Sequence, residues 1–252
     1  MHREYLINFW LAILGIILTL FNIFVLQNHF IISKTVDNIP TKFDVTIGDE
    51  VFKHIKAKLL SPDDKKIQNQ LALVLSSLFP NSTDGTFKYQ LYIEKNNQVN
   101  AYALPGGIII LNSGLINAVQ SSEELLAVIA HEISHIQHRH HVKNLVHRSG
   151  VYVISSIIFW GATNIDLVKE GSSFLMSMSY SRQQELEADR EALKILSAAG
   201  ISSQGMVDFL SRLMQNKSST NLAILNTHPD TKARIQEVKK LPVIIPLKTL
   251  RR

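Results

Sequence analysis

The run of residues 131–135, which reads H-E-I-S-H, constrains this chain more than any other feature. On a helix, the first and last positions of this H-E-x-x-H pattern share one face. His131 and His135 then point to one spot, where zinc accepts nitrogen ligands at about 2.0–2.1 Å. Glu132 lies about 100° around the helix, where it can accept a proton from an attacking water. The pattern therefore predicts a catalytic zinc site.

The residues before this run predict a helix that holds it rigidly. Ser121 or Ser122 can cap the helix, and Glu123 and Glu124 place negative charge in its first turn. Apolar residues then recur with helical period at positions 125, 126, 128, 129, 133 and 136. A histidine pair at the end of a buried helix has the rigidity that a metal site needs.

The same region is rich in histidine, and this leaves a second interpretation open. Further histidines follow at positions 138, 140, 141 and 147. A metal-buffering helix or a solvated basic helix has such a composition. A buffer binds several metals weakly, whereas a catalytic site binds one tightly and loses it when His135 is replaced by alanine.

A second predicted helix supplies the third ligand. It begins within residues 180–189, and apolar residues at positions 192, 193, 195 and 196 continue it. Glu185 and Asp189 are four residues apart and share a face, whereas Glu187 lies about 200° from Glu185. We therefore assign Glu185 to the metal and predict that Glu187 is a solvated charge. Asp189 is the candidate for the carboxylate that accepts the other N–H of a ligand histidine.

Four stretches together resemble the HtpX- and BepA-type zinc metallopeptidases, a gluzincin family that includes the CAAX prenyl proteases and the mitochondrial inner-membrane stress protease. They are residues 100–107 (NAYALPGG), 123–135, 181–189 (SRQQELEAD), and 227–229 (THP) followed by Arg234 and Ile235. Their order and spacing match the family over most of residues 43–240. In the family's E-x-E-A-D run the first glutamate binds zinc, and here that residue is Glu185.

The resemblance implies what the chain does. We expect a metalloendopeptidase with one Zn²⁺ per chain that hydrolyses peptide bonds of polypeptide substrates, in quality control of envelope proteins. A catalytically silent zinc fold that acts as a chaperone or scaffold is the alternative, although such a protein need not keep Glu132. A prenyl-protein protease is disfavoured because the chain has too few spanning segments.

The fold class expected for residues 43–252 is α+β, a mainly helical zincin domain with a small antiparallel sheet. Helices are predicted over residues 49–60, 62–78, 202–215 and 231–240, and strands over 87–94, 99–103 and 108–111. Proteases commonly hold a substrate as an added strand on an exposed sheet edge. We expect Gly107, Ile108, Ile109 and Ile110 to form that edge, with an ordinary buried strand as the alternative.

The N-terminus predicts a membrane anchor. No Lys, Arg, Asp or Glu occurs from Tyr5 to Ser33, and about twenty apolar residues cross a bilayer. Because no small-residue cleavage site follows the apolar run, residues 1–27 are expected to stay as a single-pass anchor, with residues 28–42 as a linker. The flanking charges barely decide the orientation. The resemblance implies a bacterial inner membrane with the catalytic domain in the periplasm.

A second apolar stretch, residues 149–165, lies between the histidines and Glu185. A single crossing there would put Glu185 on the other side of the bilayer from His131 and His135. We therefore expect that this stretch is buried in the domain or lies in the membrane interface.

Composition excludes several other classes of site. The chain has 252 residues and no cysteine, which rules out a thiolate zinc site and a disulfide framework. The net charge of +5 comes without a clustered, base-reading face, so we expect no nucleic-acid partner. The basic balance fits an anionic bilayer surface. The sequence does not indicate an oligomeric state.

Two roles are open for His228, which precedes Pro229 in a predicted loop. It can fill a fourth zinc position in a resting state or make a structural hydrogen bond. It is also one of four candidates for stabilising the oxyanion, together with Tyr180, Arg182 and Arg234.

Overall fold

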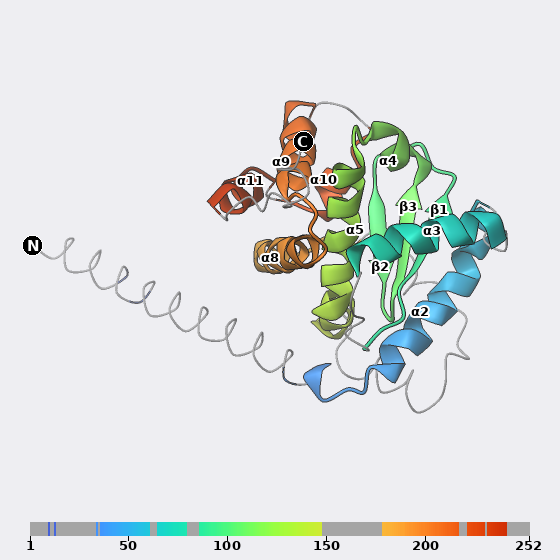
Figure 1. Ribbon diagram of the computed structural model, residues 1–252. Coiled ribbons are helices and arrows are strands. Elements are labelled where there is room, and N and C mark those ends of the chain that lie inside the picture. Colours follow the sequence, from blue (N-terminus) through green and yellow to red (C-terminus); the bar gives the residue numbers. More distant parts are fainter. Residues whose placement is uncertain are drawn as a thin grey trace, which may run out of the picture.

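Helices surround a three-stranded sheet in the computed structural model of this protein (Figure 1). The structure describes residues 36–60, 65–79, 86–147, 178–216, 221–229 and 231–240, with residues 10, 13 and 34 besides. The helices are α2 (Lys42–Ile55), α3 (Lys65–Leu78), α4 (Ser113–Ala118), α5 (Ser122–Gln137), α8 (Arg182–Ala198), α9 (Gln204–Gln215), α10 (Ile224–Thr227) and α11 (Thr231–Lys240), with the 3₁₀ helix η1 (Lys56–Lys58). The strands are β1 (Gln90–Glu94), β2 (Ala101–Leu104) and β3 (Ile108–Asn112). The predicted mainly helical α+β class is confirmed.

The sheet is mixed, so the prediction of an antiparallel sheet is wrong in part. β2 and β3 pair antiparallel, whereas β1 pairs parallel with the other side of β3. The cause is the order of the strands, β1-β3-β2, in which β3 separates two strands that are consecutive in the sequence.

A glycine turn sets the antiparallel pair. Gly106 and Gly107 have φ angles of 85° and 116°. Residues with a side chain larger than hydrogen rarely adopt such angles. A Cβ atom on Gly107 would also lie 2.5 Å from the carbonyl oxygen of Lys88. Both glycines are therefore explained by backbone conformation and close packing.

The central strand β3 cannot offer an edge to a substrate, so the prediction for residues 107–110 is wrong. Its two sides are occupied by β1 and β2, and its residues are buried. Ile109 packs in one hydrophobic cluster with α5, α8 and α9, and Ile110 packs in a second cluster with α2. The strand that lies beside α5 is β2 (Figure 1).

The end of α5 is tied to the start of α2. Arg139 follows α5 with a φ of 54°, the left-handed conformation, and reverses the chain into the helical residues 140–147. Its guanidinium donates two hydrogen bonds to Asp44, at 2.6 and 2.9 Å, and others to the carbonyls of Val36 and Ile39. Val36, within the predicted linker, is fully buried. This single side chain therefore fixes where α5 ends and how residues 36–44 lie against it.

Helices α9 and α11 lie close to their predicted positions, whereas α2 begins at Lys42, earlier than expected.

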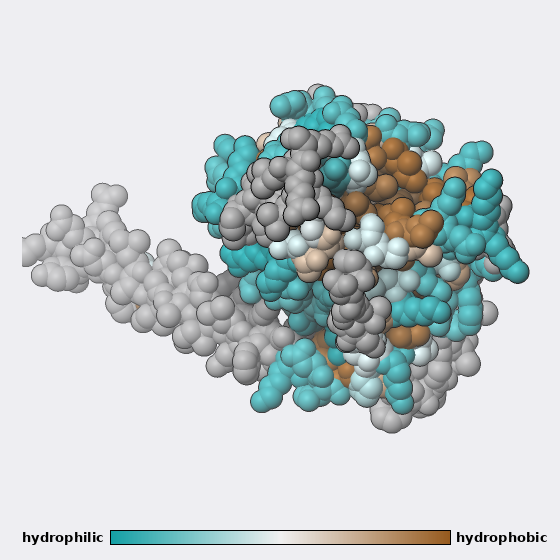
Figure 2. Space-filling view, in the orientation of Figure 1, coloured by the Kyte–Doolittle hydropathy of each residue, from teal (hydrophilic) through white to brown (hydrophobic). Residues whose placement is uncertain are grey.

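On the face that carries α3, an apolar area is bordered by hydrophilic side chains (Figure 2). Leu73 of α3 is 69% exposed, and single exposed leucines are normal in a globular domain.

None of the described helices has the length and the hydrophobicity needed to cross a bilayer. The predicted anchor, apart from Trp10 and Ile13, and the apolar stretch 149–165 lie outside the described residues. Both expectations therefore stay predictions.

Candidate metal centre

Helix α5 presents His131 and His135 on one buried face, as their spacing predicts. The Ser121 side chain accepts a hydrogen bond from the Glu124 N–H at 3.2 Å, so Ser121 is the N-cap. Leucine and isoleucine side chains on the opposite side of α5 pack in the core, which fixes the rotation of the helix. The two histidines are almost completely buried.

Helix α8 brings Glu185 to the same place. It begins with a capping box in which the Ser181 hydroxyl and the Gln184 side chain each bind the other residue's backbone N–H. This box fixes the first turn, and Glu185 in that turn is fully buried. Residues that are fifty positions apart in the sequence therefore meet because α5 and α8 pack against each other (Figure 1).

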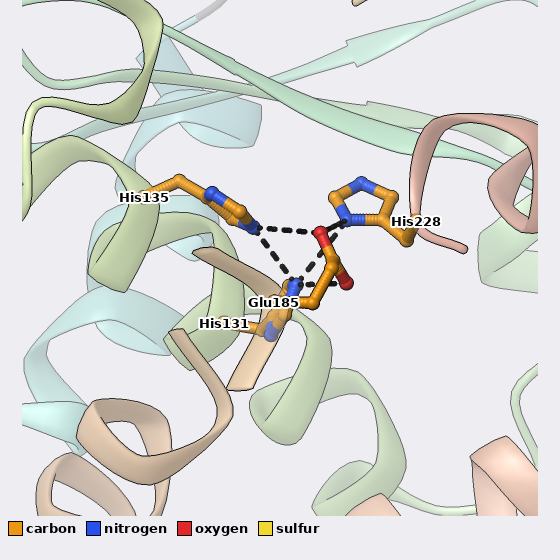
Figure 3. Close-up of side chains that lie close together, drawn as sticks. All are labelled: His131, His135, Glu185 and His228. Carbon is orange, nitrogen blue, oxygen red and sulfur yellow. Dashed lines mark hydrogen bonds and ion pairs between the residues drawn. The ribbon is translucent and has the colours of Figure 1, made fainter. Parts of the chain in front are cut away.

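Figure 3 shows His131, His135, Glu185 and His228 converging on one point. The Nε2 atoms of His131 and His135 lie 3.0 Å apart, and they are 3.6 and 3.4 Å from the Glu185 carboxylate. Ligands at the zinc–nitrogen distance on a tetrahedron are about 3.4 Å apart. The separations of the donor atoms thus fit one small divalent ion.

The outward contacts of the histidines show which nitrogen faces the centre. His131 Nδ1 lies 2.9 Å from the Asp189 carboxylate, so that nitrogen carries the proton and Nε2 presents a lone pair. His135 Nδ1 faces His140 Nδ1 at 2.9 Å, and its Nε2 points inward. Two imidazole nitrogens and a carboxylate oxygen that face one another in a buried space are the kinds of ligand that zinc takes in proteins. The donor set therefore fits a zinc ion.

Glu132 is buried beside this group and is not part of it. Its side chain is 1% exposed, and neither carboxylate oxygen has a hydrogen-bond partner among the described residues. The nearest basic atom is His228 Nε2, at 3.4 Å from Oε1. Burial raises the pKa of Glu132. A carboxylate kept bare in this way is placed for proton transfer.

Arg234 of α11 has a role that the sequence did not reveal. It donates two hydrogen bonds of 2.7 Å to Asp189, and its third nitrogen lies 2.6 Å from Glu185 Oε2. Burial alone would raise the pKa of Glu185, but Arg234 and His228 together hold it well below its usual range. The guanidinium is thus bound between two carboxylates, next to the ligand histidine His131.

The other three candidates for stabilising the oxyanion lie at different distances from the group of metal donors. His228 Nδ1 lies 3.0 Å from Glu185 and 3.3 Å from His131 Nε2, within the metal group. Tyr180 stacks on His135 at 3.7 Å between ring centroids, and its hydroxyl binds His141 at 2.8 Å. Arg182 is exposed and lines a separate surface hollow with Glu187.

Glu187 is partly exposed, as helix geometry predicts, but it also has two histidine partners that the prediction lacked. Its Oε2 lies 3.1 Å from His140 Nε2, and its Oε1 lies 3.4 Å from His138 Nδ1. The hydrogen bond from His140 is the main cause that lowers the pKa of Glu187 to about 2. The histidines after the H-E-x-x-H run are visible in the sequence as possible partners of a carboxylate. Their contact with Glu187 depends on the left-handed turn at Arg139, which the sequence does not indicate.

An apolar hollow adjoins Glu132 and His228. It lies between α5, α9, α10 and α11, and aliphatic and aromatic side chains make up most of its lining. They include Val128, Met206, Phe209, Leu210, Leu213 and Ile224, and the polar residues His131, Thr231 and Arg234 line it as well.

Comparisons with known proteins found one family model and several similar proteins. A model of peptidase family M48 matches residues 63–242. Mitochondrial metalloendopeptidase OMA1 of Schizosaccharomyces pombe is 24% identical over 81% of this chain and 62% of its own length. The beta-barrel assembly-enhancing protease of Yersinia pestis is 26% identical over 78% of this chain and 43% of its own. A crystal structure of Ste24p from S. mikatae matches with a TM-score of 0.44 and 20% identity, over 91% of this chain and 65% of that one. This chain thus spans about half the length of the curated relatives.

Proposed function

Because the chain belongs to peptidase family M48, we propose that it is a zinc-dependent endopeptidase that hydrolyses peptide bonds of protein substrates. The observation that supports this most is the convergence of His131, His135 and Glu185 beside the bare carboxylate of Glu132. Residues that only bind a metal for structure need no such carboxylate.

Each residue has a distinct part in the proposed reaction. His131, His135 and Glu185 hold the zinc ion, and Asp189 fixes the orientation of His131 through Nδ1. A bound zinc ion supplies Lewis acidity and lowers the pKa of water towards 7. Glu132 accepts a proton from the attacking water and passes it to the leaving amine.

The hollow beside Glu132 has a volume of about 30 Å³, which is room for a water molecule and not for a substrate side chain. Such a water would lie beside the carboxylate that we propose as the acceptor of its proton.

The setting that we propose is the bacterial envelope. Residues 1–27 would anchor the chain in the inner membrane, with the catalytic domain in the periplasm, where misassembled proteins are its substrates. The support comes from the name of one relative, a beta-barrel assembly-enhancing protease, and from the uncharged run of residues 5–33. A silent chaperone remains the alternative function, and the presence of Glu132 disfavours it.

Removal of the metal is expected to abolish cleavage. Full-length protein dialysed against a chelator should lose its activity on casein, and one equivalent of Zn²⁺ per chain should restore it. Mg²⁺ serves as the control, because it prefers oxygen ligands in octahedral geometry and should not restore the rate. Cleavage that continues after elemental analysis shows no bound transition metal would contradict the proposal.

Replacement of His228 by alanine is expected to raise basal cleavage several-fold. His228 Nδ1 contacts Glu185 and its Nε2 faces Glu132, so it can fill the fourth position of the donor group, which a substrate carbonyl would otherwise take. Alanine opens that position. Casein cleavage and self-cleavage by the purified variant measure the effect, and an unchanged or lower rate would exclude a capping role.

A further inference from the structure

A second group of side chains that can bind a metal lies next to the candidate centre, on the Nδ1 side of His135. His138 and His140 flank the left-handed turn at Arg139. Both histidines face Glu187, which lies in the second turn of α8. One nitrogen of each histidine and a carboxylate oxygen lie within 4.8 Å of one another. None of these three belongs to the set around Glu132.

The geometry of this outer group fits a transition metal. His138 Nδ1 and His140 Nε2 each face a different oxygen of Glu187, at 3.4 and 3.1 Å. These separations are near the roughly 3.4 Å expected between ligands on tetrahedral zinc. His138 Nε2 lies 4.0 Å from Glu191, whose carboxylate adds a second negative charge beside the group.

The group is also open to solvent on one side. The side chains of His138 and Glu187 are 28% and 45% exposed, whereas His140 is buried. A metal from solution can therefore reach two ligands directly and meet the third at the inner wall. A water molecule can complete the coordination, as it does in sites with three protein ligands.

We propose that His138, His140 and Glu187 form a second, outer Zn²⁺ site that opposes zinc binding at the inner centre. The outer site stands on its own geometry, and its opposition to the inner centre rests on the proposed function. The link is the contact between His140 Nδ1 and His135 Nδ1, which are 2.9 Å apart.

Hydrogen-bond direction explains the opposition. His135 binds the inner metal through Nε2, so its N–H is on Nδ1 and donates to His140 Nδ1. His140 then carries its proton on Nε2 and donates it to Glu187. A metal at the outer site would bind His140 through Nε2, in place of that proton. The neutral His140 ring then carries its one N–H on Nδ1. This N–H faces the N–H of His135, so the hydrogen bond between the two rings is lost. Figure 3 shows this side of His135 pointing away from the inner ligands.

The test counts zinc on the full-length protein in detergent. Metal-free protein is titrated with Zn²⁺ against a fluorescent zinc chelator, and the stoichiometry is read for the wild type, His138→Ala and Glu187→Gln. We expect two equivalents in the wild type and one in each variant, with affinity for the lost zinc falling by more than about tenfold. His54→Ala, which removes an exposed histidine on α2, should still bind two.

Reciprocity gives a second readout. Because coupling acts equally in both directions, His131→Ala should lose the inner zinc and bind the outer zinc about 5-fold or more tightly. For the same reason, Glu187→Gln should bind the inner zinc about 5-fold or more tightly than the wild type does once its outer site is filled.

Other outcomes overturn the proposal. One equivalent in the wild type, or two in both His138→Ala and Glu187→Gln, excludes the outer site. Equal affinity of the inner site for zinc in Glu187→Gln and in the wild type with a filled outer site excludes the opposition. If the chain were not a peptidase, casein would not be cleaved, but the number of zinc ions bound would be unchanged. The two failures are therefore distinguishable.

Discussion

Replacing Glu132 by glutamine is expected to lower kcat/KM for casein by about 10²–10⁴. Glutamine keeps the shape of the side chain but cannot take a proton from water. Since Glu132 is outside the group of metal donors, bound zinc should stay at the wild-type level. Cleavage followed by gel or by fluorescence, with zinc content measured on the same sample, separates loss of chemistry from loss of metal.

The matched control for this variant is Glu123→Gln. Glu123 lies on the same helix, in its exposed first turn, and the same chemical change there should leave the rate unaltered. If the Glu132 and Glu123 variants cleave casein equally well, zinc-peptidase catalysis through Glu132 is excluded. A chaperone or scaffold would then be the better assignment.

Replacing Arg234 by leucine is expected to destabilise the domain by about 3–5 kcal/mol. The variant leaves Asp189 and Glu185 buried without the guanidinium that lies 2.6–2.7 Å from both. A zinc ion compensates Glu185, so the loss of stability should be larger in chelator than in zinc. Thermal unfolding of the purified protein, with and without added Zn²⁺, measures both effects.

Lys232→Leu is the control for this variant, because Lys232 is exposed on the same helix and surface changes are usually within about 0.5 kcal/mol. An Arg234 variant that melts with the wild type would show that the buried carboxylates are compensated by other groups. Equal melting shifts in chelator and in zinc would show that Arg234 does not share Glu185 with the metal.

The sequence predicted the inner donor set because helix periodicity is a local property. Two histidines four residues apart and the pair Glu185 and Asp189 share faces wherever their helices lie, and the structure brings these faces together. Their roles at the metal stay predictions. The family was recognisable because four short stretches occur in a fixed order, and the match over residues 63–242 confirms it.

Features that depend on long-range packing were missed. Strand periodicity gave three strands, but it cannot tell that β3 lies between the other two. Glu187 was judged from its own helix alone, whereas its partners come from the chain beyond Arg139. Arg234 likewise acquires its role from carboxylates on α8, which no local pattern of α11 encodes.

The contacts of Arg139 with residues 36–44 limit how far the domain can lie from the anchor that we propose. Only residues 28–35 separate that anchor from Val36, and a chain of that length reaches at most about 30 Å. An anchored domain would therefore stay close to the lipid surface. Polypeptides that remain near the bilayer would meet its metal centre often, and those that diffuse freely through the surrounding fluid would seldom do so.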